Sequence, residues 1–137
     1  MTLHRYYIWA NRMRTHFDEI LSRGVPVETV EIECLLYMSY WYGGLYVVIE
    51  GWQALKLTDP IIDSLLQSPN VKLLRQYRNG TFHFQIKYYN DKFSSFTKGT
   101  DAVAWVRKLN TEFGRYFLGA YPHRPSGSAA VELQGRT

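Results

Sequence analysis

Apolar residues recur at intervals of three or four along much of the chain, which is the spacing of an α-helix. Near the start, the apolar positions at this spacing are Tyr6, Trp9, Met13 and Phe17. A long apolar run, CLLYMSYWYGGLYVVI, follows, and a third set lies toward the end of the chain. These patterns predict helices over residues 3–23, 27–56 and 101–118.

Helix-breaking and capping residues divide the rest of the chain. Thr58, Asp59 and Pro60 together form a start signal for a short helix that extends to about residue 67. Ser68 and Pro69 end that helix, and Asn70 then has a side chain suited to cap the next one. The glycine pair at 43–44 predicts either a bend or a close approach by another helix.

The stretch RNGTFHFQ, residues 78–85, fits two structures. Asn79-Gly80 followed by alternating aromatic residues is typical of a hairpin turn leading into a strand. At about 100° per residue, however, one apolar stripe continues across the supposed turn, within an arc of roughly 100°. The stripe consists of Leu73, Leu74, Tyr77, Thr81, Phe84 and Tyr88. We therefore predict a helix that continues through His83, with Gly80 as its weak point.

The opposite arc of the same predicted helix is mostly polar. It carries Arg75, Gln76, Arg78, Asn79 and His83. Asn79 and His83 are four residues apart and would be neighbours on a helix surface. The arc also carries Val71, Phe82 and Ile86. A fully solvated face would not usually hold three large apolar side chains, so we expect this face to be half-buried at a subunit contact or cleft edge.

The composition supports a folded chain. The 137 residues are 46% apolar and 16% aromatic, enough for one domain with a real core. We predict an all-α bundle of about four to five helices over residues 1–120. Residues 121–137 are rich in Pro, Gly and Ser, and this predicts a loose tail.

Charge and cysteine content narrow the function only slightly. The net charge of +4 favours an anionic partner weakly, because many proteins carry such a charge. The single cysteine, Cys34, lies in an apolar run and is expected to be a small buried residue. No Cys/His cluster has metal spacing, so no metal or cofactor is expected. The apolar run is shorter than a membrane span and no secretory signal is visible, so we expect a cytoplasmic protein without a membrane anchor.

The predicted helix carries a short motif, which consists of an Arg, a polar residue, three further positions and a His. This motif, late in a small helical domain, resembles that of the HEPN superfamily (higher eukaryotes and prokaryotes nucleotide-binding). The matching residues are Arg78, Asn79 and His83. The resemblance implies a dimer whose motif helices face each other across one positively charged cleft. Many such proteins are metal-independent ribonucleases, often toxins with an antitoxin partner or phage-defence effectors. Some of these toxins carry a modifiable Tyr two residues after the His, where this chain has Gln85.

The chemistry of RNA cleavage suits these residue types. RNA supplies its own nucleophile, the 2′-hydroxyl, so the protein must move protons and stabilise the phosphorane. Histidine can transfer protons near neutral pH, and arginine holds phosphate oxygens with a fixed fork of donors. The resemblance gives Arg78 and His83 catalytic positions and Asn79 an auxiliary one. Arg75 and Lys72 are assigned to RNA positioning.

Three other functions stay open. An inactive HEPN-like module would bind RNA, a nucleotide or a protein through Arg78 without proton transfer by His83. A dimerisation scaffold would need neither residue for chemistry. An aromatic ligand pocket would make the chain a small-molecule sensor, although the many Tyr and Trp residues are most simply core and dimer packing.

Overall fold

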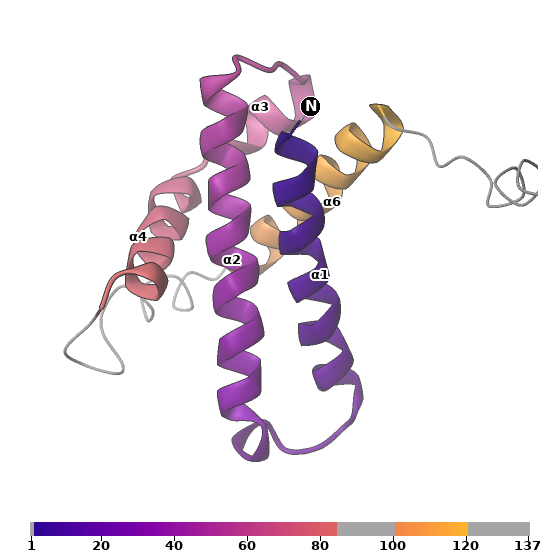
Figure 1. Ribbon diagram of the computed structural model, residues 1–137, viewed down its shortest axis with the longest axis vertical. Helices are drawn as coiled ribbons and strands as arrows, with labels where there is room; N and C mark the ends of the chain where they lie inside the picture. Colours follow the sequence, from indigo (N-terminus) through magenta and orange to yellow (C-terminus); the bar gives the residue numbers. More distant parts are fainter. Residues whose placement is uncertain (1, 85–100, 121–137) are drawn as a thin grey trace, which may run out of the picture.

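The computed structural model describes residues 2–84 and 101–120, and the regular structure in this part of the chain is entirely helical (Figure 1). The predicted all-α bundle is therefore confirmed. Its helices are α1 (Leu3–Ser22), α2 (Glu31–Ala54), α3 (Pro60–Leu65), α4 (Asn70–Phe82) and α6 (Ala102–Ala120), with a 3₁₀ turn η1 (Val27–Thr29) before α2. The expected tail at 121–137 lies outside the described residues.

Helices α1 and α2 form an antiparallel pair along the long axis of the molecule (Figure 1). Three contacts in succession give the pairing: Leu3 with Gly51, Ala10 with Gly44, and His16 stacked on Tyr37. A Cβ added to Gly44 would lie 3.1 Å from the Ala10 Cβ, so small residues let the two backbones approach closely. The close approach predicted for the glycine pair at 43–44 is confirmed.

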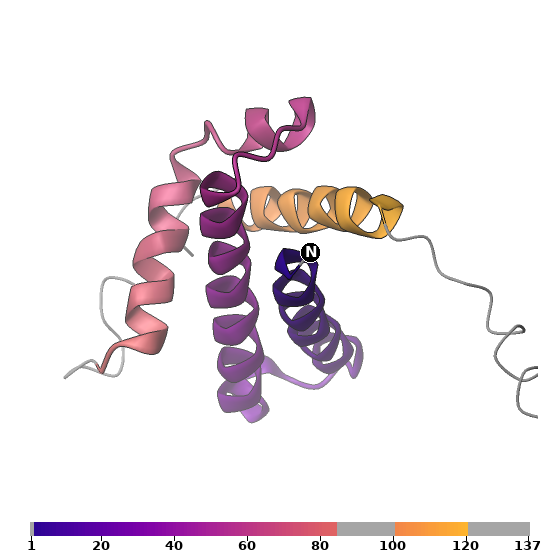
Figure 2. The ribbon, with the colours of Figure 1, turned by 45° about the horizontal axis from the view of Figure 1, so that its top comes forward.

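Helix α6 packs across this pair and closes the bundle (Figure 2). The buried Trp41 indole donates a hydrogen bond of 3.0 Å to Asn110 Oδ1, and the Asn110 amide donates one of 3.0 Å to Asn11 Oδ1. At the side of this network, Arg107 donates two hydrogen bonds to the Asp18 carboxylate, at 2.7 and 3.2 Å. Polar contacts therefore fix α6 on both helices of the pair.

The starts of α3 and α4 show how local sequence sets the helix ends. The Asp59 carboxylate accepts hydrogen bonds from the backbone N–H groups of Ile61 and Ile62, as predicted for a helix cap. At α4 the prediction was wrong, since Asn70 is the first helical residue and the Ser68 hydroxyl accepts its N–H. The Asn70 side chain is buried and donates to Asp101 instead.

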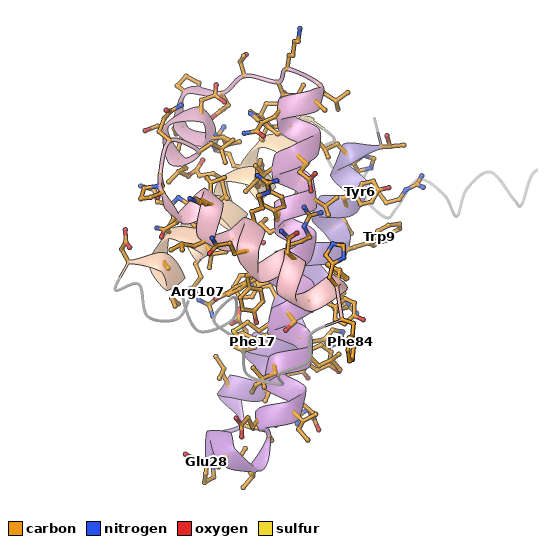
Figure 3. The ribbon with its side chains drawn as sticks, turned by 90° about the vertical axis from the view of Figure 1, so that its left-hand side faces the viewer. Tyr6, Trp9, Phe17, Glu28, Phe84 and Arg107 are labelled. Carbon is orange, nitrogen blue, oxygen red and sulfur yellow. The ribbon has the colours of Figure 1, made fainter. Side chains whose placement is uncertain are left out.

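The aromatic residues divide between the core and the surface. The buried ones include Tyr7, Trp41, Tyr42, Tyr46 and Trp52. Tyr6, Trp9 and Tyr40 are 44 to 56% exposed and so lie outside the core, and the dimer packing expected of such residues stays a prediction. The first two project from one edge of α1 (Figure 3). Cys34 is buried as predicted, and burial raises the pKa of its thiol.

Helix α2 supplies much of the core. Its side chains with at most 2% exposure include Trp41, Leu45, Val48, Ile49 and Trp52. In the described part of the chain it is also the one helix long and apolar enough to cross a membrane. A core helix passes the same test of length and composition, so this property alone does not place the chain in a membrane.

Candidate functional site

Helix α4 continues through Asn79 and Gly80, which settles the choice between hairpin and helix. Leu74 and Tyr77 are buried on the predicted apolar stripe, and the Tyr77 hydroxyl lies 3.2 Å from the Ser39 hydroxyl of α2. Gly80 is itself buried inside the helix. The hairpin is wrong, because the apolar stripe and not the turn-like dipeptide decides the local structure.

The helix ends at Phe82, earlier than predicted. His83 has extended backbone angles (φ −113°, ψ 133°), and its N–H makes the last helical hydrogen bond, 3.1 Å to the Asn79 carbonyl. Phe84, which the periodicity placed on the buried stripe, is 94% exposed. Gly80 and the consecutive aromatic residues are weak helix formers, so the last turn has little intrinsic stability. His83 therefore lies beyond the helix and does not share a helix face with Asn79.

Arg78 packs against α2 of its own chain. Its Nη1 lies 3.1 Å from Oε1 of Glu50, and its guanidinium carbon lies 5.0 Å from the centre of the Tyr46 ring. The side chain is 25% exposed, and its Nε is buried without a hydrogen-bond partner among residues 2–84 and 101–120. Arg78 is therefore half-buried as predicted, but by α2 of the same chain. The subunit contact or cleft edge expected for this face stays a prediction.

Phe82 attaches the end of α4 to the middle of α2. A Cβ added to Gly43 would come within 2.5 Å of the Phe82 ring, so the glycine leaves the space that the ring occupies. The same ring meets Tyr40 edge to face, with the ring centres 5.7 Å apart. The position of His83 thus depends on how the Phe82 ring packs against α2.

The structure brings the motif residues to one end of α4 in different environments. Arg78 faces α2, Asn79 is partly buried and His83 is exposed just after the helix. Lys72 and Arg75 are exposed on the earlier turns of the same helix. Since α4 contains Lys72, Arg75 and Arg78 and no Asp or Glu, it is a cationic element.

Two residues that sequence reasoning did not assign belong to this site. Glu50 pairs with Arg78, and Tyr40 packs with Phe82. Both lie on α2, more than twenty-five residues before their partners along the chain. Helical periodicity reports the faces of one helix and not the pairing between helices, so no signal in the sequence identifies them.

A separate concavity lies where α2 meets α3. Its volume is about 350 Å³, and its lining includes Trp52, Lys56 and Asp63. The Asp63 carboxylate already accepts hydrogen bonds of 3.0 Å from the Trp52 indole and the Asp59 N–H. The Asp63 carboxylate thus joins α2 to the start of α3. Among the residues described by the structure, no group of three or more His, Cys, Asp or Glu is placed to hold a metal ion.

Comparison of the chain with protein-family models, with curated proteins and with solved structures gives no match. The resemblance to the HEPN superfamily therefore stands on the residues of the motif and on the helical context.

Proposed function

We propose that this protein is a metal-independent ribonuclease of HEPN type, acting in the cytoplasm as a toxin or phage-defence effector. The observation that carries the proposal is the arrangement at the end of α4. A cationic helix there holds Arg78 in a half-buried position and ends one residue before the exposed His83. Both residue types needed for phosphodiester cleavage thus lie five residues apart in the sequence, at the same end of α4.

In the proposed reaction, the RNA 2′-oxygen attacks the adjacent phosphorus and the bond from phosphorus to the 5′-oxygen breaks. One group takes the proton of the 2′-hydroxyl, and another gives a proton to the leaving 5′-oxygen. His83 serves in proton transfer, and the Arg78 guanidinium stabilises the charge of the phosphorane. Lys72 and Arg75 contact the RNA backbone, and Asn79 keeps only the auxiliary polar position that the resemblance implies. The products carry 2′,3′-cyclic phosphate and 5′-hydroxyl ends.

The proton transfers require two groups, and one chain supplies one histidine in the motif. A homodimer that joins two α4 ends would supply both, with one His83 as base and the other as acid. Such a contact would also bring two cationic helices together, which phosphates bound between them would stabilise. An antitoxin would then act by covering the same cleft.

A second function is favoured by one observation, the ion pair between Arg78 and Glu50. A guanidinium held in place by a carboxylate can still contact an anion through its other N–H groups, but it offers less charge to a phosphorane. The chain would then be an inactive HEPN-like module that binds RNA, a nucleotide or a protein, with no proton transfer by His83.

Parallel measurements of cleavage and affinity on two variants separate these functions. For the ribonuclease, His83→Ala abolishes turnover of a broad RNA panel and leaves most of the RNA affinity, whereas Arg78→Ala weakens both. For the binding module, wild type binds without cutting and only Arg78→Ala reduces affinity. His16→Ala is the matched control, because His16 stacks on Tyr37 within α1 and α2 and has no place in the proposed site.

A further inference from the structure

Tyr40 and Phe82 form an open aromatic corner beside the motif. Their rings meet at an interplanar angle of 78°, with centres 5.7 Å apart, and the two side chains are 50% and 49% exposed. A flat ring entering this corner would stack on one aromatic face and meet the other ring edge-on, two arrangements that aromatic groups favour. The two rings are thus half-exposed and set at an angle at which one planar group can contact both.

The corner lies next to a cation on the same helix face. Phe82 follows Arg78 by four residues, so the two side chains are neighbours one turn apart. Both face α2, where Arg78 contacts Glu50 and Tyr46 while Phe82 contacts Gly43 and Tyr40. Arg78 and the corner formed by Tyr40 and Phe82 therefore lie next to each other where α4 packs on α2.

The charge around the corner favours an anionic occupant. Helix α4 carries three cations and no acid, and Glu50 of α2 is the carboxylate that pairs with one of them, Arg78. The charge of this group is therefore still positive. A ligand that combines a planar ring with an adjacent anion would use both features. Unpaired nucleotides do this, because their bases stack on aromatic side chains while their phosphates bind Lys and Arg.

We infer that Tyr40 and Phe82 are a base-stacking platform, which holds one unpaired base of the RNA next to the phosphate bound by Arg78. This inference rests on the proposed function and assigns two further residues to its site. A base paired in a duplex has both faces covered by its neighbours, so the platform discriminates against double-stranded RNA.

The platform is tested by measuring binding to three labelled ligands at one fixed salt concentration. The ligands are oligouridylate, a ribose-phosphate oligomer of equal length without bases, and duplex RNA. Tyr40→Leu keeps an apolar side chain of similar bulk and removes the ring. It is expected to weaken oligouridylate binding about five- to a hundredfold, the range for losing one stacked base, and to leave the abasic oligomer unaffected. Tyr40→Phe should restore binding to within about twofold of wild type.

Trp9→Leu is the matched control, because Trp9 is 56% exposed on α1 and its ring contacts Tyr6 of the same helix. The platform is overturned if wild type and Tyr40→Leu bind oligouridylate equally well. It is also overturned if wild type binds the abasic oligomer as tightly as it binds oligouridylate. The same conclusion follows if Tyr40→Leu loses RNA binding because a dimer dissociates, which sedimentation measures. Wild type that binds single strands through Tyr40 but never cuts them supports the platform and contradicts the ribonuclease.

Discussion

The Arg78 guanidinium lies 3.1 Å from a carboxylate oxygen of Glu50, and this pair joins the motif helix to the core helix of the bundle. Glu50 is 47% exposed and Arg78 is 25% exposed, so water screens the pair from one side. A partly exposed pair contributes little to folding, typically up to about 1 kcal/mol. Its larger effect is on the charge that Arg78 can offer to an anion, because the carboxylate neutralises the guanidinium at close range.

Glu50→Gln is therefore expected to strengthen RNA binding. The amide keeps a hydrogen-bond acceptor for Arg78 and removes the competing negative charge, so affinity at low salt should rise about threefold or more and the gain should shrink as salt increases. Fluorescence anisotropy with a labelled RNA measures this. Glu33→Gln, at the other end of α2 beside Arg23, is the matched control and should change affinity less than twofold. Weaker binding by Glu50→Gln would mean that the ion pair mainly holds Arg78 in position.

Gly43→Ala is expected to displace the Phe82 ring and with it the end of α4. The added methyl would lie 2.5 Å from a ring carbon, and because the ring is half-exposed it can move outward at a cost of about 1 to 3 kcal/mol. Urea unfolding measures the loss. Gly119→Ala in α6 meets nothing within 4 Å and should be neutral or slightly stabilising. Equal stability of the two variants would show that Phe82 does not seat against Gly43.

Asn110→Ala is expected to destabilise the bundle by about 1 to 3 kcal/mol. The substitution leaves the Trp41 indole N–H buried without its acceptor, and the penalty for an unpaired buried donor has this size. Thermal unfolding followed by Trp fluorescence measures the change. Thr111→Ala, at the exposed neighbouring position, should cost less than about 0.5 kcal/mol. A loss no larger than that of Thr111→Ala would contradict the role of Asn110 as a buried link.

Asp18 is expected to make stability fall in acid. Hydrogen bonds from Arg107 hold the pKa of Asp18 below its ordinary value, against the opposing effect of partial burial. The folded state therefore binds protons less readily than the unfolded state, and this stabilisation is complete above pH ~4 and lost as the pH falls through the lowered pKa. Asp18→Asn should cost about 1 kcal/mol at pH 7, and its difference from wild type should shrink in acid. A difference that stays constant from pH 7 to pH 2 would exclude this linkage.

The sequence predicts single helices well and contacts between helices poorly. The apolar stripe through Leu74 and Tyr77 correctly predicts a helix across Asn79 and Gly80. The same stripe wrongly continues through Phe84, because the helix end depends on weak local propensity and on Phe82 packing against α2. The partners Glu50 and Tyr40 depend on the packing of α4 on α2, which periodicity within one helix does not report. The motif could therefore be recognised in the sequence, while the surroundings of Arg78 required the structure.

Analysis of RNA products formed in excess EDTA tests the ribonuclease proposal most directly. Wild type, a folded His83→Ala variant and the His16→Ala control would be incubated with the same RNA panel, and the new ends would be identified chemically. The expected result is 2′,3′-cyclic phosphate and 5′-hydroxyl ends from wild type and His16→Ala, with no products from His83→Ala. Equal cutting by His83→Ala, or no cutting by well-folded wild type on any RNA, would contradict it.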